Sequence, residues 1–306
     1  MNEFAQLKPV DVHGIASCIG AQNVRCYSAP LVLQGLDLSS KLKAEGWDAH
    51  WSKTILLEDA QPENADVEQA KYVAIHDICQ QLSINVQQSV SHHRPFIILG
   101  GDHSCAIGTW SGAASALHDK GDIGLVWIDA HMDSHTPETS HSGAIHGMPV
   151  ASLLGYGDPN LVNIAYAGQK IKPENICLIG VRSYEPEEKQ LLDQLGVKVF
   201  YADECEQQGL EKVFAEALTR ICKNTCGFGI SLDLDAIDPL EAPGVGSPAA
   251  NGLNATELMN ILSKQKYDEH FLGFEMVELN SSQDKDDKTA KLAVDLIQSI
   301  FKRDFE

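Results

Sequence analysis

The chain of 306 residues has few basic residues, no long hydrophobic run and no linker of biased composition. Lysine and arginine number 23 against 43 aspartate and glutamate residues, and the formal charge of −20 argues against binding to nucleic acid or to an anionic membrane. No apolar stretch approaches the length of a membrane span. The N-terminus has no basic region followed by an apolar core, so we expect a cytoplasmic protein. The acidity suits a cationic ligand or divalent ions, although solubility alone accounts for most of the charges equally well.

No tract rich in proline, glycine or serine divides the sequence, and no internal repeat is present. Because α/β folds of this length commonly form one unit, we expect residues 1–306 to make a single domain. Eight cysteines are scattered without the paired spacing of a zinc site, and the Cys222-x-x-x-Cys226 spacing alone is a weak signal. We therefore expect most cysteines, including Cys105, to be buried and reduced packing residues.

The clearest helix in the sequence begins near residue 66. It should end near His92-His93-Arg94-Pro95, because positive charge suits a helix C-terminus and proline ends the helix. These two histidines are therefore interpreted as helix-end residues rather than metal ligands. The apolar stripe of this helix recurs every three or four residues and consists of Val67, Ala70, Ala74, Ile78, Leu82, Val86 and Val90.

Strand-like runs alternate with further helical stretches in the rest of the chain. A first strand followed by a glycine turn is expected over residues 10–20. The later strand runs lack polar alternation, so helices should cover both of their faces. This pattern predicts a three-layer α/β/α sandwich with a mostly parallel sheet. The further helices are expected near residues 104–119, 185–195, 210–223, 255–265 and 287–302.

Five of the strand-like runs end in polar or charged residues that together predict a metal site. In an open α/β sheet, ligands bind just beyond the carboxyl ends of parallel strands. If these runs are neighbours in one sheet, their polar ends meet in a single crevice that collects histidines and carboxylates. The runs are residues 96–103, 124–133, 176–182, 230–235 and 271–278.

Three motifs at these ends have the spacing of metal ligands. In Asp129-Ala-His-Met-Asp133, an extended chain would direct alternate side chains to the same side, and Asp233-x-Asp235 repeats this spacing. His103 follows Gly100-Gly101, which allow a sharp turn close to a bound group. The six candidate ligands are His103, Asp129, His131, Asp133, Asp233 and Asp235.

The chemistry of these ligands favours a pair of hard divalent ions. Oxygen and imidazole ligands without thiolates favour an ion such as Mn²⁺ over structural zinc. Bridging carboxylates could hold two ions roughly 3.5–4 Å apart, as in two-metal hydrolases. A single Asp-x-Asp at a strand end is usually a turn former or a helix N-cap. Three such motifs favour the metal interpretation, because packed carboxylates repel one another without cations.

Three segments resemble the arginase/agmatinase/formiminoglutamase family of binuclear manganese ureohydrolases. They are Gly-Gly-Asp-His-Ser at 100–104, Asp-Ala-His-Met-Asp at 129–133 and Ser-Leu-Asp-Leu-Asp-Ala-Ile-Asp-Pro at 231–239. The resemblance extends from about residue 95 to the C-terminal helix, and residues 22–27 differ from the usual glycine-rich stretch of the family. It implies a single α/β/α domain with an eight-stranded parallel sheet, two Mn²⁺ ions (with Co²⁺ or Ni²⁺ as alternatives) and assembly into homotrimers or hexamers.

The resemblance also implies how the six ligands are shared between the ions. Asp129 and Asp233 would bridge both ions. One ion would be bound by His103, Asp129, Asp133 and Asp233, and the other by His131, Asp129, Asp233 and Asp235.

The loop at residues 134–149 is the segment expected to select the substrate. Its ending, Ser-Gly-x-x-His-Gly-x-Pro, resembles arginases rather than agmatinases. By this resemblance, Ser142 would bind the α-carboxylate of the substrate and His146 would lie beside the guanidinium group. Glu278 would hold the guanidinium group, and Ser247 matches a small hydroxyl residue near it.

Other positions both support and depart from the family pattern. Glu185, which replaces the usual aspartate, and Glu188 would hold an α-ammonium group by charge-assisted hydrogen bonds. His135 stands in place of an asparagine that contacts the α-carboxylate, and Ser140 replaces a threonine. Without the family, His135 is a surface-loop histidine, the serines are turn residues, and the glutamates are acids at a helix N-terminus.

The function implied by the resemblance is hydrolysis of L-arginine to ornithine and urea by a hydroxide shared between the two ions. Asp133 would orient the hydroxide and take its proton, and His146 would shuttle protons to water. An agmatinase or another guanidino-acid hydrolase, such as a guanidinobutyrase or formiminoglutamase, is the alternative enzyme. In each case the partner is a small cationic guanidino substrate. A metal-loaded binding protein without activity is the non-enzyme alternative.

Overall fold

The structure, a computed structural model, describes residues 7–22, 26–56, 67–264 and 270–302. The expected helix start at residue 66 and the expected helix end at residue 265 lie outside these residues, as does part of the divergent segment 22–27.

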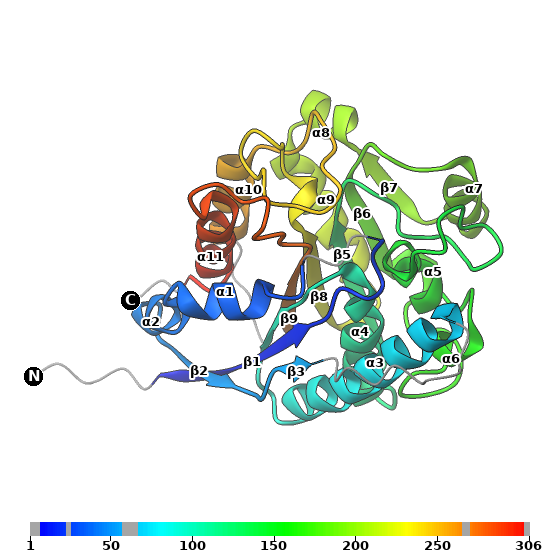
Figure 1. Ribbon diagram of the computed structural model, residues 1–306, viewed down its shortest axis with the longest axis horizontal. Coiled ribbons are helices and arrows are strands. Elements are labelled where there is room, and N and C mark those ends of the chain that lie inside the picture. The colour runs from blue at the N-terminus through cyan, green and yellow to red at the C-terminus, as the bar shows by residue number, and fades with distance from the viewer. Residues whose placement is uncertain (1–6, 23–25, 57–66, 265–269, 303–306) are drawn as a thin grey trace, which may run out of the picture.

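The centre of the fold is a parallel sheet (Figure 1). Its strands are β1 (Lys8–Ala16), β2 (Trp47–Trp51), β3 (Ile55–Leu56), β4 (Phe96–Leu99), β5 (Asp122–Ile128), β6 (Ile176–Val181), β7 (Lys198–Tyr201), β8 (Thr225–Asp233) and β9 (Phe271–Val277).

The strand order places the five expected strand runs next to one another. The order is β2-β1-β4-β9-β8-β5-β6-β7, with the short β3 paired to β1 beside this path. All of these pairs are parallel. The carboxyl ends of β4, β9, β8, β5 and β6 therefore meet at one edge of the sheet, which confirms the prediction that their polar ends are neighbours.

Helices cover both faces of the sheet and confirm the expected three-layer α/β/α sandwich (Figure 1). One layer contains α1 (Ala29–Gly35), α2 (Leu38–Ala44), α8 (Ala202–Gln208), α9 (Leu210–Ile221), α10 (Ala255–Lys264) and α11 (Lys288–Ile300). The other contains α3 (Val67–Ser91), α4 (Ala106–Leu117), α5 (Pro149–Leu153), α6 (Pro159–Val162) and α7 (Pro186–Leu195).

The side chains of β5 show why this strand needs cover on both faces. Leu125 and Trp127 belong to the apolar cluster under α3 and α4, whereas Val126 and Ile128 belong to the cluster under α9 and α10. All four side chains are fully buried. Because successive side chains of a strand point to opposite faces, a continuous apolar run buries both of them.

The long helix α3 follows the expected stripe and ends where expected. Ile78, Leu82, Val86 and Val90 are buried in the cluster on its face of the sheet. The helix ends at Ser91, just before the histidine pair, and His93 adopts a positive φ of 55° beyond the helix end.

The first strand and the turn after it lie where the sequence predicts them. β1 stops at Ala16, the Ser17 carbonyl accepts a hydrogen bond from Asp102 N–H (3.2 Å), and the chain turns at residues 19–20. However, the sequence provided no indication of β2, β3, β7 or the short helices α1, α2, α5, α6 and α8. These elements are short, and Trp47–Trp51 lies half-buried at an edge of the sheet, where the apolar signal is weak.

Four cysteines, Cys79, Cys105, Cys177 and Cys205, are buried and not disulfide-bonded, as expected. Burial raises the pKa of the Cys105 thiol well above its usual range, which suits a packing role. Cys18 and Cys26 are exceptions to the expectation for most cysteines, because they form a disulfide. Their Cα atoms lie 5.5 Å apart in the turn after β1, a separation that the sequence spacing did not reveal.

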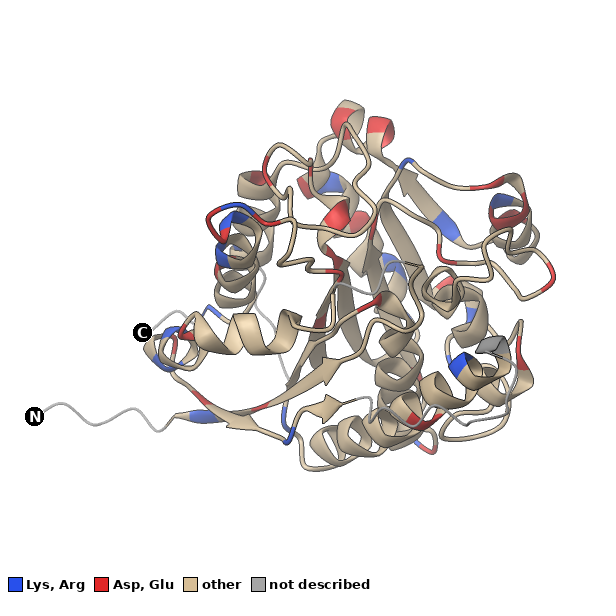
Figure 2. Ribbon diagram, viewed as in Figure 1, with Lys and Arg blue, Asp and Glu red and all other residues tan. Residues whose placement is uncertain are grey.

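Acidic positions are spread over helices and loops on several sides of the molecule, and further acidic segments lie in the centre of the view where strands end (Figure 2). Among the described residues, no helix combines the length and apolarity needed to cross a bilayer.

Candidate metal centre

All six predicted ligands gather at the carboxyl edge of the sheet. Asp129 follows β5, and Asp233 is the last residue of β8. His103 and Asp235 lie in short 3₁₀ turns, His103–Cys105 and Leu234–Ala236, that directly follow the sheet edge. Because the strand ends are fixed by pairing within the sheet, these side chains are held by the most rigid part of the fold.

The first ligand group surrounds the Nδ1 atom of His103. The Oδ2 atoms of Asp129 and Asp133 lie 3.1 Å from it, and the Oδ2 atom of Asp233 lies 3.4 Å from it. His103, Asp129 and Asp233 are buried and have the separations of a metal-ligand set.

The second ligand group surrounds the Nδ1 atom of His131. It lies 3.1 Å from the Oδ2 atom of Asp235 and 3.5 Å from the Oδ1 atom of Asp129. The two oxygens of Asp129 thus face different histidines, which is the arrangement that a bridging carboxylate requires. Asp233 contacts only His103 in this way, and its Oδ1 atom accepts a hydrogen bond from Asp235 N–H (2.8 Å). Bridging by Asp233 stays a prediction.

The hydrogen bonds of His103 test whether a cation fits this site. Its Nε2 atom lies 2.9 Å from the Ser231 hydroxyl, which in turn donates to Glu275 (2.7 Å). Since the serine proton is used there, Nε2 carries a ring proton, and in the neutral ring, which is the form that binds metal, Nδ1 would offer a lone pair. This Nδ1 atom is buried without a hydrogen-bond partner among the described residues, although carboxylate oxygens surround it. A lone pair that faces carboxylates fits a bound cation.

The pKa shifts of the protein without ions indicate the same need for positive charge. Burial, with the charge of Asp129, raises the pKa of Asp133 to about 6. Burial, with the charges of Asp235 and Asp129, raises the pKa of Asp233 well above its usual range. Burial alone would lower the pKa of His103, but the surrounding carboxylates raise it well above its usual range. Two divalent ions would relieve this repulsion between buried carboxylates.

Two further buried residues, which sequence reasoning missed, orient the ligands. The Trp127 ring stacks on the His103 ring at 4.0 Å, and its Nε1–H donates to Asp129 (2.9 Å). Glu275 is fully buried in β9 and accepts hydrogen bonds from the side chains of Thr109 (2.6 Å) and Trp110 (2.8 Å) as well as from Ser231. A lone acid inside an apolar strand run was the signal that could have identified Glu275, because buried carboxylates need partners.

The chain bends at Gly101 and Asp102, as the glycine pair predicts, and Gly101 also allows a close backbone contact. A Cβ atom on Gly101 would lie 1.7 Å from the Ser17 carbonyl oxygen, so the close approach is to the loop after β1. Neither Gly100 nor Gly101 has a positive φ. Positive φ angles occur instead at Asp133 (48°) and Glu278 (66°), where the strained backbone is imposed by the surrounding fold.

A cavity of about 150 Å³ opens beside the ligand groups. It is lined by four predicted ligands and by every residue that was predicted to bind substrate or to act beside it. Its predicted lining residues are His131, Asp133, His135, Ser140, Ser142, His146, Glu185, Glu188, Asp233, Asp235, Ser247 and Glu278. His103 and Asp129 lie buried beneath them. A larger hollow of about 730 Å³, lined partly by Tyr201 and Glu257, lies away from these ligands.

The inner part of the cavity holds Glu278 and His146. Glu278 Oε1 accepts a hydrogen bond from His103 N–H (2.9 Å) and lies 3.0 Å from His146 Nδ1. Burial alone would lower the pKa of His146, but the charge and hydrogen bond of Glu278 raise it to about 9. Ser247 is exposed and lines the cavity beside this pair.

The outer part of the cavity joins the substrate loop to the N-terminus of α7. His135 Nε2 lies 3.1 Å from Glu185 Oε2 and 3.6 Å from Glu188 Oε2. Glu185 and Glu188 also form a capping box, with Glu185 N–H donating to Glu188 (3.0 Å). Burial raises the pKa of Glu188 to about 8. The glutamates are therefore both helix N-terminal acids and cavity residues.

The two loop serines stabilise turns and also lie at the cavity. The Ser140 hydroxyl accepts a hydrogen bond from Gly143 N–H, and the Ser142 hydroxyl accepts one from Ala144 N–H, both at 3.1 Å. They are turn residues that also line the cavity.

Comparisons with known proteins agree with this geometry. The model of the arginase family matches residues 19–302, so the resemblance extends well before residue 95, where the sequence motifs placed its start. An arginase of Bacillus caldovelox is 35% identical over 297 residues, which cover 96% of this chain and 98% of that protein. The crystal structure of an arginase from Bacillus subtilis has a TM-score of 0.88 and 32% identity, covering 98% of this chain and 100% of that one. The crystal structure of the B. caldovelox arginase also has a TM-score of 0.88, with 33% identity, covering 98% of this chain and 100% of that one. The chain therefore belongs to the arginase family.

Proposed function

We propose that this enzyme hydrolyses L-arginine to ornithine and urea with two bound Mn²⁺ ions. The observation that carries the proposal is one cavity with two chemically different ends. Its inner end joins both ligand groups to Glu278, and its outer end is lined by Ser142, His135 and the two glutamates of α7. This arrangement suits a substrate with a guanidinium group at one end and an amino-acid group at the other.

The inner end supplies the groups that would bind and orient the guanidinium. The Glu278 side chain is 5% exposed, and in the absence of substrate it contacts His146. A guanidinium that pairs with this buried carboxylate would be held beside the ligand groups by a charge-assisted hydrogen bond.

The proposed chemistry assigns distinct roles to the residues at the inner end. Two divalent ions held by the six ligands would lower the pKa of a water molecule, so that hydroxide is available near neutral pH. Asp133, whose Oδ2 atom faces His103, would accept a proton at its carboxylate and return it to the departing amine. His146 lies at the cavity wall with its ring 25% exposed and would pass protons to bulk water.

The outer end favours an amino acid over agmatine. Glu185 and Glu188 provide carboxylates for an α-ammonium group, and Ser142 provides a hydroxyl for an α-carboxylate. Agmatine has no α-carboxylate and would form fewer hydrogen bonds with this loop, whose Ser142 and His135 would keep their contacts within the protein. Fewer hydrogen bonds to the bound substrate favour the amino acid over agmatine.

The preferred ion and substrate can be tested together. Urea release would be measured with L-arginine, agmatine and 4-guanidinobutyrate, and formamide release with formiminoglutamate, after incubation with Mn²⁺. We expect turnover to be confined to L-arginine. Preference for another substrate would refute the assignment of the outer end, and absence of all turnover despite bound metal would favour a binding protein.

We propose that the protein is cytoplasmic and forms a single domain, as its sequence predicts, and that it assembles into homotrimers or hexamers, as the family resemblance implies. Light scattering coupled to gel filtration would measure the assembly, and a monomer would refute it.

A further inference from the structure

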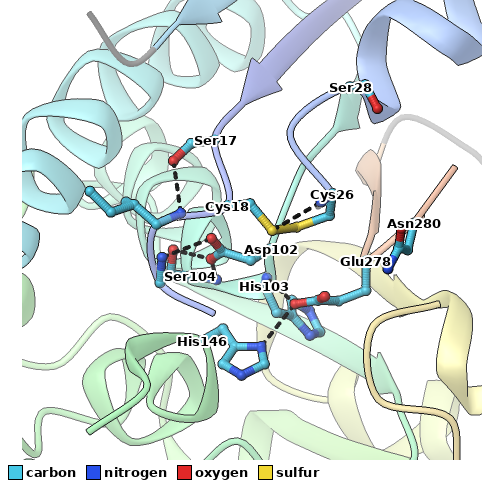
Figure 3. The surroundings of a disulfide bond; sticks show 12 residues. Ser17, Cys18, Cys26, Ser28, Asp102, His103, Ser104, His146, Glu278 and Asn280 are labelled. Atoms are coloured by element: carbon cyan, nitrogen blue, oxygen red, sulfur yellow. Dashed lines mark hydrogen bonds and ion pairs between the residues drawn. A yellow bond between two sulfur atoms is a disulfide. The ribbon is translucent and has the colours of Figure 1, made fainter. Parts of the chain in front are cut away.

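The loop after β1 carries a disulfide beside the candidate metal centre (Figure 3). Cys18 and Cys26 are bonded through sulfur, and each residue is 2% exposed. Cys26 lines a small hollow of about 60 Å³ together with His146, Ser247 and Glu278. The disulfide is therefore next to the inner end of the substrate cavity.

This loop is hydrogen-bonded to two segments that build the site. Gly20 N–H donates to Asp102 Oδ2 (2.9 Å), and the Gly20 carbonyl accepts from His146 N–H (3.2 Å). Asp102 Oδ1 also accepts from Ser104 N–H (2.9 Å), in the turn that carries His103. A change in the position of Gly20 would therefore be transmitted to the backbone at His146 and, through Asp102, to the backbone at His103.

The packing around Gly20 leaves little room for such a change while the site stays intact. A Cβ atom at this position would lie 2.7 Å from Asp102 Oδ1 and 2.8 Å from the Ser104 hydroxyl. The loop is thus seated directly against Asp102, and the disulfide closes the loop on both sides of that contact.

We propose that Cys18–Cys26 is a redox-modification site at which disulfide reduction by a dithiol or phosphine lowers the turnover of the enzyme. The inference rests on the proposed arginine hydrolysis. With a dithiol, the protein S–S bond takes up two electrons and two protons to give two thiols, and the dithiol is oxidised to its own disulfide. A cross-link limits the open conformations of the segment that it closes. Its loss would populate conformations in which Gly20 no longer holds His146.

The burial of the two sulfur atoms affects how readily the two states interconvert. Because each of the two cysteines is 2% exposed, oxidants in solution reach the reduced pair poorly, and we expect it to re-form its disulfide slowly. The two states can then be assayed separately.

The test compares the full-length Mn²⁺-loaded protein before and after reduction. A water-soluble trialkylphosphine would be used and then removed; it becomes a phosphine oxide with oxygen from water while the disulfide becomes two thiols. Alkylation and mass spectrometry should find six free cysteines before treatment and all eight after it. We expect kcat for L-arginine to fall about tenfold on reduction, with KM and manganese content little changed. The reason is that the rate of catalysis falls steeply when a catalytic group is misplaced.

Variants separate the disulfide from other thiols. Cys18→Ser combined with Cys26→Ser should show the low kcat with or without the phosphine. Cys222→Ser combined with Cys226→Ser is the matched control, because these cysteines are not disulfide-bonded and do not line the cavity, and it should respond like the unaltered protein.

Hydrogen exchange gives a readout that does not depend on the substrate. Exchange of the peptide containing His146 should be faster in the reduced protein. Equal kcat and equal exchange in both states, or eight alkylated cysteines before reduction, would overturn the redox site. Faster exchange without any turnover of L-arginine in the oxidised protein would overturn the proposed function instead.

Discussion

Replacement of Glu275 by glutamine should weaken one of the two metal sites selectively. The Glu275 side chain is fully buried and does not itself contact the predicted ions, but it accepts the hydroxyl proton of Ser231, which accepts the ring proton of His103. Glutamine has nearly the same shape but no charge. The substitution therefore tests whether this carboxylate fixes the tautomer that directs the His103 lone pair toward the ion.

The magnitude follows from three hydrogen bonds. Glu275 accepts from Thr109, Trp110 and Ser231 at 2.6, 2.8 and 2.7 Å. Conversion of each charge-assisted bond to a neutral one should cost about 1 kcal/mol, or roughly 2–4 kcal/mol of folding stability in total. The hydroxyl of Thr109 can donate to the Cys105 carbonyl (3.3 Å) instead of to residue 275. The NH₂ group of the glutamine would therefore best face Thr109. Loss of such outer support typically weakens metal binding by about 10–100-fold, or roughly 1.4–2.7 kcal/mol.

Titration of the metal-free protein with Mn²⁺ by calorimetry would measure this effect. We expect the binding step of the ion near His103 to weaken and the step of the ion near His131 to remain unaltered. Glu211→Gln on the exposed face of α9 is the control and should change neither step. Unaltered affinity for both ions in Glu275→Gln would refute the reasoning, and an equal loss at both sites would show general damage to the fold rather than lost orientation of His103.

Three further predictions concern the ligands and the inner pair. Asp233→Ala should lose bound metal and nearly all activity, and full activity with intact metal content by elemental analysis would contradict its proposed bridging role. His146→Ala should retain metal and substrate binding while kcat falls about 10²-fold, as expected for loss of a proton-transfer group; unaltered turnover across pH would remove His146 from the mechanism. In the metal-free protein, burial alone would lower the pKa of His146, but the charge and hydrogen bond of Glu278 raise this pKa from 6.5 to about 9. Protonated His146 therefore contributes stability that is fully present below pH 6.5 and is lost as the pH rises through about 9, so the difference in Tm between the unaltered protein and His146→Ala should shrink over that range.

Much of the fold could be predicted because its signals are local. The apolar runs ending at Leu99, Ile128 and Val277 have no polar alternation, and the stripe of α3 repeats with helical spacing. Strands buried on both faces must be covered by helices, so the layered architecture follows from the pattern. The edge strands β2 and β7 were missed, because their partly exposed side chains carry a weaker pattern.

The sequence by itself determined which residues could bind metal, because the motifs after β5 and β8 place His131 and four aspartates close together along the chain, although the chain bends after β5 and Asp133 has a positive φ. Only the tertiary structure decided which ligands face one another, since this depends on the order of β4, β9, β8 and β5 in the sheet. Several contacts of the site join segments that are far apart in the chain. They are the contact of Asp129 with His103, the hydrogen bonds that connect His103 to Glu275 through Ser231, and the position of Cys26 beside His146. Local spacing holds no information about such pairs, because strand order and packing bring their atoms together only in the folded protein.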